Sequence, residues 1–355
     1  MARRAVIFGG PSPEHDISIS TGLQATRLTS DVEAIYWDKT GRFHLVDPDS
    51  EVSAFADGVP RKARELTFVA EPGAGFVQRK KPLDIGVILN CCHGGPGEDG
   101  TLQGLFDLVG YRYSGPGQWG SALGMDKLSF GAAVAQVGLP TLPRTLLRKD
   151  APPPFQGPYI VKPRFGGSSI GIEVVEDHAT AVALLSAPNM GDGAVVEPFL
   201  SDFRDLQIAV RTYPGLELSA IEEPVRSPGG LYSYEQKYLA WGGSGAVARK
   251  LPADLDAGLE TELREAAKVV ADLVGVRSVA RIDFLESGGK LWVNEINTIP
   301  GSLSGYLWID PVIERRRQIS DMFDELEAMR PRAFSVAGAD GSALRNAGSI
   351  AAKLG

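Results

Sequence analysis

Residues 280–301, ARIDFLESGGKLWVNEINTIPG, decide the fold of this chain. Two apolar runs, at 279–285 and 291–296, flank a Ser-Gly-Gly turn at 287–289. Runs of this length on either side of a glycine turn predict a hairpin of two buried strands. The charged residues inside the stretch are therefore expected on strands and not in a loop.

Charged and amide side chains occupy alternate positions of the two predicted strands. Because side chains alternate between the faces of a strand, Arg281 shares a face with Asp283, and Glu295 shares one with Asn297. Oxygen-bearing side chains on buried strands suit Mg2+, which binds carboxylates and usually shares phosphate oxygens with a substrate. A hairpin held by an ion pair from Arg281 to one of the acids explains the same residues. This stretch alone leaves both interpretations open.

The composition indicates a globular protein of several domains. A length of 355 residues, 43% of them apolar, leaves room for two or three domains of roughly 100 to 200 residues. A formal charge of -8 argues against nucleic acid as a partner. No apolar run approaches the roughly 20 residues of a membrane span, and the opening MARRAVIFGG enters a glycine turn where a signal peptide would stay apolar. Cys91 and Cys92 are adjacent, so they cannot link distant segments by a disulfide bond. This predicts a reduced, cytoplasmic protein.

Two early strands end in glycine-rich turns that lead into helices. The run 5–8 ends in Gly-Gly-Pro-Ser at 9–12, and the run 84–90 ends in CCHGGPGEDG at 91–100. Strand, glycine turn and helix form the repeating unit of an open α/β sheet. Ligands bind at the carboxyl ends of such strands, so both turns are expected near a ligand site.

The rest of the chain alternates strands with helices. Gly-Leu-Pro at 138–140 ends a helix predicted over 125–137, and a long amphipathic helix at 255–273 precedes the hairpin. The segment 331–355, rich in Ala, Gly and Ser, is predicted to be a flexible tail without chemistry. Further strands are predicted at 32–37, 43–46, 159–162, 172–175, 194–198, 206–211 and 218–222, and further helices at 179–185 and 311–329.

The loop KPRFGGSSIG at 162–171 has the components of a phosphate cradle. Lys162 stands at a strand end, Gly167 lets backbone N–H groups approach an anion, and Ser168 and Ser169 add hydroxyls. The loop joins strand to strand and lacks the Gly-Lys-Ser/Thr order of a Walker A loop. A plain hairpin turn is the alternative, although such a turn needs fewer glycines and no buried lysine.

An apolar strand leads into the segment where two domains are predicted to join, which is Glu197, Pro198, Phe199 and Leu200. The Pro198 carbonyl can accept a hydrogen bond from an adenine amino group, and the Leu200 N–H can donate one. An ordinary linker explains the segment equally well.

Five further residues are candidates for chemistry. His93 follows the second glycine turn and suits contact with a carboxylate, proton transfer or structural hydrogen bonding. Cys91 and Cys92 precede it in an apolar setting that raises a thiol pKa, and no spaced Cys or His cluster indicates zinc. Lys237 and Tyr238 lie in the polar, aromatic loop LYSYEQKYLAWGG, which suits a closing lid or a surface loop without a role.

Together these segments resemble the ATP-grasp superfamily, and within it the D-alanine:D-alanine ligase family, over roughly residues 4–310. The motifs that carry the resemblance are GGPSPEHDIS, HGGPGEDGTLQGLF, YSGPG with MDK, VKPRFGGSSIG, YEQKY, ARIDF and NEINTIPG. The resemblance implies an α/β protein in which an N-terminal open parallel sheet domain precedes an α+β ATP-grasp fold of two subdomains. The corresponding domains are 1–120, 121–200 and 201–330, followed by the tail at 331–355.

The same resemblance implies cofactors and residue roles. The cofactors are ATP and two Mg2+ ions, with Mn2+ as a substitute. Glu14, helped by Ser168 and Tyr238, would bind the ammonium of the first amino acid, and Arg281 with the Gly301 N–H would form an oxyanion site. The other assigned residues are Lys127, Lys162, Gly167, Ser169, Glu197, Pro198, Phe199, Leu200 and Asp205 for the nucleotide, Asp283, Glu295 and Asn297 for the metal ions, and His93 and Lys237 beside the reacting groups. Asp205 stands where family members usually have Glu.

The implied activity is the ATP-dependent joining of two D-alanines into the peptidoglycan dipeptide. A carboxylate is a poor acyl donor, so the γ-phosphoryl group moves onto it, which calls for lysines and metal ions around the developing charge. An amine then attacks the acyl phosphate, ADP and phosphate are released, and an always-charged arginine suits the tetrahedral oxyanion. The implied partners are ATP, D-alanine or other amino acids, and a second copy in a homodimer, with neither nucleic acid nor membrane.

The segment after Gly301 departs from the family. Members commonly continue with Phe-Thr and a later Ser before a Pro and a Trp, whereas PGSLSGYLW reaches Trp308 sooner and has Tyr306 where space for the second substrate is expected. A peptide or amide ligase of specialised metabolism, with the same mechanism and a different acceptor, is therefore an alternative. A nucleotide-binding protein without catalysis would have no reason to combine Arg281 with metal ligands.

Overall fold

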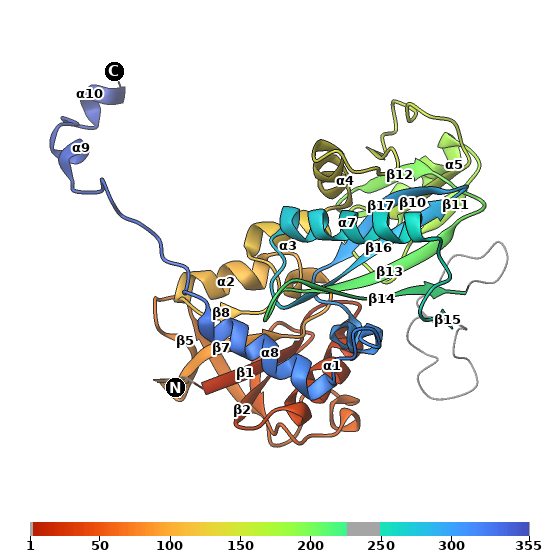
Figure 1. Ribbon diagram of the computed structural model, residues 1–355. Helices are drawn as coiled ribbons and strands as arrows, with labels where there is room; N and C mark the ends of the chain where they lie inside the picture. Colours follow the sequence, from red (N-terminus) through yellow and green to blue (C-terminus); the bar gives the residue numbers. More distant parts are fainter. Residues whose placement is uncertain (1–2, 226–248, 355) are drawn as a thin grey trace.

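The computed structural model describes residues 3–225 and 249–354. Within these residues, the strands form three sheets of eight, four and five strands (Figure 1). The sheets follow one another along the chain without exchanging strands. This order matches the α/β class predicted from the sequence, while the predicted domain boundaries stay predictions.

The N-terminal sheet is parallel in one half and antiparallel in the other. β1 pairs in parallel with β2 and β7, and β7 pairs in parallel with β8, as the two glycine-turn units predict. The antiparallel half is built largely from residues 48–82, where no clear period predicted a strand. In spatial order the strands are β6 (Lys81–Pro82), β5 (Gly75–Gln78), β4 (Arg64–Val69), β3 (Phe43–Val46), β2 (Val32–Trp37), β1 (Arg3–Gly9), β7 (Ile85–Asn90) and β8 (Arg112–Tyr113).

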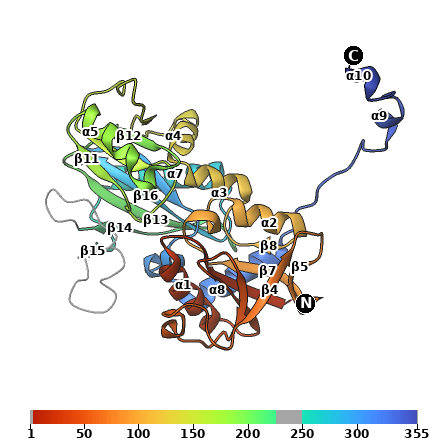
Figure 2. The same ribbon diagram turned by 180° about the vertical axis from the view of Figure 1, so that it is seen from behind.

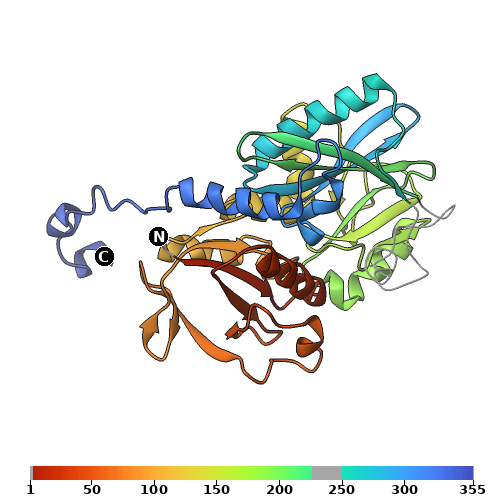
Figure 3. The ribbon, with the colours of Figure 1, turned by 60° about the horizontal axis from the view of Figure 1, so that its bottom comes forward.

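Both faces of this sheet are covered, which is why β1 is apolar throughout. Val6 and Phe8 point into one core, whereas Ala5 and Ile7 point into the other. The first core is closed by α1 (His15–Leu28) and by α8 (Arg315–Ala328), which returns from the far end of the chain (Figure 3). The second core is closed by α2 (Thr101–Val109).

The middle sheet is antiparallel and follows a pair of helices. The helix predicted over 125–137 is confirmed as α4 (Lys127–Gln136), which begins after Asp126, whereas the preceding helix α3 (Gln118–Met125) was not predicted. Asp126 has an extended backbone, and its side chain accepts a hydrogen bond from Leu128 N, so it caps α4. In spatial order the strands are β11 (Glu173–Val175), β10 (Tyr159–Pro163), β12 (Ala194–Pro198) and β9 (Thr145–Leu146), with α5 (His178–Ala183) packed on them.

The predicted hairpin forms two strands of the third sheet and is longer than expected. The apolar face of α7 (Ala257–Val274) packs on this sheet around Leu263 and Val270 (Figure 2). The helix starts at Asp256, whose side chain accepts from the N–H groups of Gly258 and Leu259. In spatial order the strands are β15 (Arg249–Lys250), β14 (Glu217–Pro224), β13 (Arg204–Arg211), β16 (Val279–Ser287) and β17 (Lys290–Asn297).

The segment after the hairpin runs back to the N-terminal sheet. It begins as the 3-10 helix η6 (Gly301–Leu307), in which Ser302, Leu303 and Ser304 have φ values of 48°, 51° and 51°. Three successive non-glycine residues in this left-handed region indicate backbone strain. After α8, a tail with α9 (Ser342–Arg345) and α10 (Ala351–Leu354) extends away from the body in Figure 1. In the described part of the chain, no helix combines the length and the apolar character that crossing a membrane requires.

Candidate active site

Polar side chains of three neighbouring strands form the floor of a cavity. In strand register, Gln207 of β13 is the partner of Asp283 of β16, which in turn is the partner of Glu295 of β17. Asp205 lies two residues from Gln207 and is the register partner of Leu285, so both strands present a second pair to the same side. All five residues line the cavity. Asp283 and Glu295 thus belong to a row of polar groups that crosses the sheet.

A β-bulge in the hairpin adds one more polar side chain to this floor. Asp283 pairs with Glu295, but the next residue, Phe284, pairs with Val293, so Asn294 has no residue opposite it. A bulge re-aims side chains that a regular strand would send to opposite faces. Asn294 and Glu295 consequently both line the cavity although they are neighbours in the chain.

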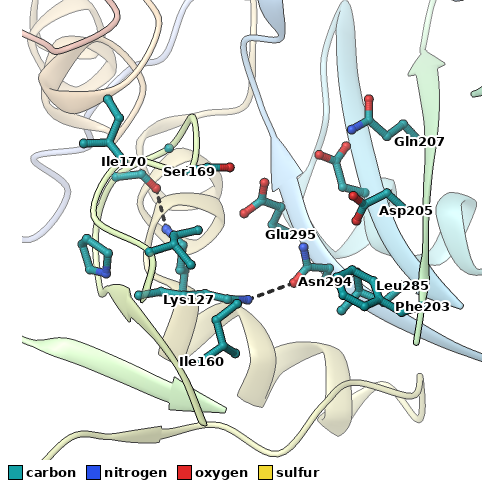
Figure 4. A pocket seen from close by; sticks show the side chains of 16 residues that line it. Lys127, Ile160, Ser169, Ile170, Phe203, Asp205, Gln207, Leu285, Asn294 and Glu295 are labelled. Atoms are coloured by element: carbon teal, nitrogen blue, oxygen red, sulfur yellow. Dashed lines mark hydrogen bonds between the residues drawn. The ribbon is translucent and has the colours of Figure 1, made fainter. Parts of the chain in front are cut away.

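Two lysines and the glycine-rich loop form the opposite wall. The cavity has a volume of about 90 Å3, and Figure 4 shows Lys127 and Ser169 across from Asp205, with Glu295 and Asn294 between them. Lys162 Nζ donates to Asn294 Oδ1 at 3.3 Å, which links the wall to the floor. Burial lowers the pKa of Lys127. The site therefore places cations and backbone N–H groups opposite carboxylates, as the binding of a metal–phosphate group requires.

The base of the glycine-rich loop is bonded to the start of α4. Arg164 donates to Asp126, the cap of α4, through Nε at 2.9 Å and Nη2 at 2.6 Å. Ser168 and Ser169 have φ values of 55° and 59°, and Gly166 has a φ of 127°. These φ values make the loop a tight turn, and the successive backbone N–H groups of such a turn can bind an anion.

Glu197 lies in a buried ion cluster behind this wall. It is 1% exposed, accepts from Lys162 Nζ at 2.8 Å and lies 3.2 Å from Arg144 Nε. Burial alone would raise the pKa of Glu197, but the positive charges of Lys162 and Arg144 outweigh it and lower that pKa. The structure does not bring Glu197, or residues 198–200 after it, into the lining of the cavity, and Phe199 N donates to Pro158 O at 2.9 Å. Their contact with adenine stays a prediction.

Arg281 is bound to the predicted metal ligand Asp283. Its Nε donates to Oδ1 at 2.6 Å and its Nη2 to Oδ2 at 2.8 Å, while Asn297 Nδ2 donates to Oδ2 at 3.2 Å. The ion pair proposed for the hairpin is therefore present.

The same residues also fit Mg2+. Among the described residues, no group of three or more His, Cys, Asp or Glu side chains forms a metal cluster. The donor set is instead the carboxylates of Asp283 and Glu295 with nearby amide oxygens, and Mg2+ usually completes such a set with phosphate oxygens.

Glu14 is hydrogen-bonded to Ser168 at the edge of a second, larger cavity. The Ser168 hydroxyl donates to Glu14 Oε1, and a Cβ added to Gly167 would lie 3.2 Å from Glu14 Oε2. Glu14, both glycine turns and the glycine-rich loop line this cavity of about 610 Å3. The structure thus brings together the first glycine turn and the glycine-rich loop, as the assigned binding of a substrate ammonium requires.

His93 makes two buried hydrogen bonds. Its Nδ1 lies 2.6 Å from Ile299 O and its Nε2 lies 2.9 Å from Thr21 Oγ1. A carbonyl can only accept, so Nδ1 carries the proton and Nε2 accepts from the threonine. Burial lowers the pKa of His93, which favours this neutral form. The structural interpretation of His93 is therefore confirmed, and its contact with a substrate carboxylate stays a prediction, as does the role of Gly301, the first residue of η6.

Glu98 is a buried carboxylate to which no role was assigned from the sequence. It accepts from Gly94 N at 2.9 Å, Ile299 N at 2.9 Å and Thr298 Oγ1 at 3.1 Å. Burial and the nearby charge of Glu14 raise the pKa of Glu98 to about 7. Glu98 ties the second glycine turn to the end of the hairpin, and its place inside the glycine-turn motif was the available signal.

The remaining candidates lie apart from the cavity or outside the described residues. Cys91 and Cys92 are both fully buried, and burial raises the pKa of each thiol, as predicted. Lys237 and Tyr238 lie outside the described residues. Residues of the site that were missed from the sequence are Arg144, Phe203, Gln207 and Asn294. Gln207 had a signal, because it lies two residues from Asp205 on one strand.

Two family models match most of the chain. The models described as "D-ala D-ala ligase N-terminus" and "D-ala D-ala ligase C-terminus" match residues 3–116 and 147–314. A protein named D-alanine--D-alanine ligase from a Nitratiruptor species is 33% identical over 314 residues, which cover 86% of this chain and 90% of that relative. This chain belongs to the D-alanine–D-alanine ligase family.

Solved structures of the family have the same fold. The D-alanine–D-alanine ligase from Helicobacter pylori aligns with a TM-score of 0.72 and 25% identity, over 93% of this chain and 100% of its own. The VanG D-Ala:D-Ser ligase from Enterococcus faecalis aligns with a TM-score of 0.76 and 22% identity, over 92% of this chain and 100% of its own, and this likeness concerns the fold alone. The family and the fold class expected from the sequence are confirmed.

Proposed function

We propose that this protein is an ATP-dependent ligase that joins two D-alanine molecules and releases ADP and phosphate. The observation that carries the proposal is the row Gln207, Asp283 and Glu295, which faces Lys127 and Lys162 across one cavity. Membership of the D-alanine–D-alanine ligase family supports the choice of substrate.

The nucleotide is proposed to bind between the two walls of the cavity. Lys127 and Lys162 contact the phosphates, and the backbone of Gly167 and Ser169 donates to them. Asp205, at the rim of the sheet, accepts from the ribose hydroxyls. The ion cluster around Glu197 fixes the position of Lys162 by holding its ammonium at 2.8 Å.

Asp283, Glu295 and Asn297 are proposed to hold Mg2+ ions, for which Mn2+ would substitute. When bound, Mg2+ offsets the charge of the phosphate oxygens and of the developing transition state. The two carboxylates are register partners, so the sheet itself fixes their separation. Arg281 neutralises part of their charge, and it remains beside them because it lies two residues from Asp283 on β16.

Different residues of this chain are proposed to act in the successive steps of the reaction. Glu14 and Ser168 orient the first amino acid through its ammonium group, so that its carboxylate faces the phosphates. The carboxylate oxygen attacks the γ-phosphorus, ADP leaves, and an acyl phosphate forms. The amine of the second amino acid attacks the acyl carbon, phosphate leaves, and Arg281 stabilises the oxyanion of the tetrahedral intermediate.

A ligase with a different acceptor is a second candidate, and one cluster favours it. The Tyr306 hydroxyl donates to the buried carboxylate of Glu222, and the charges of Arg281 and Asp283 act on the same tyrosine. Arg249 Nη1 lies 3.1 Å from Glu222 Oε1, and its guanidinium lies over the Tyr306 ring, 5.2 Å from the centroid. A tyrosine anchored beside the proposed oxyanion site narrows the space for the acceptor.

Product analysis separates the two candidates. Purified protein is incubated with ATP, Mg2+ and pairs of amino acids, and phosphate release and product mass are followed. We expect D-alanyl-D-alanine from D-alanine alone. The absence of this dipeptide, together with robust product from another amine, would replace the first candidate by the second. Nucleotide binding without phosphate release from any pair would contradict both.

We also propose that the protein acts as a cytoplasmic homodimer on small-molecule substrates. The use of ATP and the two buried free cysteines support a cytoplasmic location. Light scattering coupled to size-exclusion chromatography tests the dimer, and a monomeric mass at micromolar concentration would contradict it.

A further inference from the structure

Another small cavity lies where the N-terminal sheet meets the start of the tail. It has a volume of about 130 Å3 and is lined by residues of β8, by Arg277 just before β16, and by residues that follow α8. Figure 1 shows β8 beside α8, close to the point where the tail leaves the body. This cavity shares no lining residue with the proposed nucleotide site.

Positive charge is concentrated in this cavity. Its described lining includes one carboxylate, Asp107, and four arginines, which are Arg112, Arg277, Arg330 and Arg332. Asp107 is already engaged, because Oδ1 accepts from the Tyr113 hydroxyl at 2.8 Å and Oδ2 from Arg332 at 2.8 Å. Like charges in one small cavity repel each other. The excess positive charge is notable in a chain whose net charge is -8.

The carbonyl contacts of these arginines orient them without neutralising them. Arg112 donates to Gly86 O at 3.2 Å and to Glu327 O at 2.9 Å. The Glu327 carboxylate, which also acts on Arg112, pairs with Arg4 at 2.7 Å. Within the described residues, no hydrogen bond or ion pair engages Arg330. The charge of the cluster is thus largely uncompensated.

Arg277 has a buried donor that no described residue satisfies. Its Nε donates to Gly115 O at 2.7 Å, and its guanidinium lies over the Tyr113 ring, 4.6 Å from the centroid. Its Nη2 is buried and has no hydrogen-bond partner among the residues that the structure describes. A buried N–H of a charged group without an acceptor is costly. An acceptor from outside the chain would remove this cost.

We propose that the cavity binds a phosphate-class oxyanion. Guanidinium groups match phosphate oxygens through paired hydrogen bonds, and several of them here surround one volume. A phosphate group needs only a few such paired hydrogen bonds, so the proposal is limited to a single phosphate group in this cavity of about 130 Å3. This group is either free phosphate or the phosphate end of a larger molecule.

One strand, β16, connects this cavity to the proposed active site. Arg277 stands two residues before Val279, where β16 begins, and β16 carries Arg281 and Asp283. An anion held by Arg277 and Arg330 would connect the start of this strand to the chain after α8. The inference does not rest on the proposed function, because anion binding is measured without turnover.

Calorimetric titration of the full chain at constant ionic strength tests the proposal. Inorganic phosphate, glycerol 3-phosphate and acetate are compared on the unaltered protein and on Arg277→Lys and Arg330→Ala. We expect each substitution to weaken phosphate binding roughly tenfold, the cost of one charge-assisted hydrogen bond. Lys162→Met is the control for phosphate bound in the nucleotide cavity, and Arg345→Ala, in the tail, is the control for the loss of one exposed charge.

Tenfold weaker binding in both arginine variants, with both controls unchanged, supports the site. Unchanged binding in both arginine variants, or a loss confined to Lys162→Met, overturns it. Acetate binding as tightly as phosphate overturns the phosphate class. Tighter binding of glycerol 3-phosphate than of phosphate identifies the phosphate end of a larger molecule as the ligand, and the reverse order identifies free phosphate. Thermal unfolding checks that each variant is folded, and Arg330→Ala removes an exposed side chain whose loss the fold tolerates.

Discussion

Asp283 and Glu295 are register partners on β16 and β17, one position before the hairpin bulges. Two carboxylates directly opposite each other on a sheet repel, so this pair costs free energy unless positive charge lies beside it. Arg281 supplies part of that charge through its two bonds to Asp283. Lys127 and Lys162 line the same cavity from the other side. The sheet thus holds negative charge in a place that suits a cation.

Replacing Arg281 by alanine tests its proposed contact with the oxyanion. We expect Arg281→Ala to lower kcat roughly 100- to 1,000-fold, the cost of removing one donor of an oxyanion site. The affinity for ADP should change much less, because Arg281 does not line the nucleotide cavity. Phosphate release and calorimetric titration with ADP measure the two effects. Arg264→Ala on α7, which loses an ion pair to Glu260, is the matched control. Near-normal turnover of Arg281→Ala would refute the assigned role.

Breaking the buried ion cluster behind the cavity is expected to lower the stability of the protein strongly. Glu197→Gln leaves Lys162 and Arg144 buried without their carboxylate, and we expect the free energy of unfolding to fall by about 3–5 kcal/mol. Urea denaturation measures this change. Glu260→Gln breaks an exposed ion pair and should cost less than about 1 kcal/mol. Equal losses in the two variants would show that the buried cluster adds nothing to stability.

Glu98 predicts a pH dependence of stability. Its pKa of about 7 in the folded chain exceeds the ordinary value of 4.5, so the folded chain binds the proton more tightly than the unfolded chain. The stabilisation is complete below about pH 4.5 and is lost as the pH rises to about 7. Relative to Glu98→Gln, the unaltered protein should lose on the order of 3 kcal/mol across this window, at about 1.4 kcal/mol per pKa unit. Denaturation of both proteins from pH 4.5 to pH 8 measures the difference, and parallel curves would contradict the prediction.

The ring of Tyr306 is expected to limit the size of the acceptor amino acid. Tyr306→Ala removes the ring beside Arg281, and we expect the kcat/KM ratio for acceptors with larger side chains, relative to D-alanine, to rise on the order of tenfold. The KM for ATP should stay unchanged, because Tyr306 does not line the nucleotide cavity. Tyr306→Phe keeps the ring and serves as the matched control. If Tyr306→Ala and Tyr306→Phe show the same acceptor profile, the ring does not limit the acceptor.

The hairpin and both glycine-turn units could be predicted because each has a strong local pattern. Apolar runs with period-two charge assign Asp283 and Glu295 to the right faces, and apolar runs before glycines place β1 and β7. The strands between residues 48 and 82 were missed because they are short and partly exposed. The helix α3 was missed because it contains Gly120 and Gly124, which are poor helix formers, whereas the composition of α4 predicted that helix over nearly its observed bounds.

The site was predicted where its residues follow strand periodicity, and missed where the structure leaves that periodicity. Asn294 reaches the cavity only because of the bulge, which the sequence does not reveal. Arg144 comes from a connection, and its contacts with Glu197 and with the backbone carbonyls of Lys127 and Asn294 depend on how two sheets pack. Such contacts between distant segments have no local signal in the chain.

The return of α8 to the N-terminal sheet has a consequence for synthesis on the ribosome. Ile319, Met322 and Phe323 fill the same core as Val6 and Phe8, so that core stays open until almost the whole chain has been made. At about 5–20 residues per second, the roughly 300 residues between the first strands and this helix take about 15 to 60 s to be made. During that interval the part of this core that α8 covers is exposed to solvent, although α1 already covers another part of it.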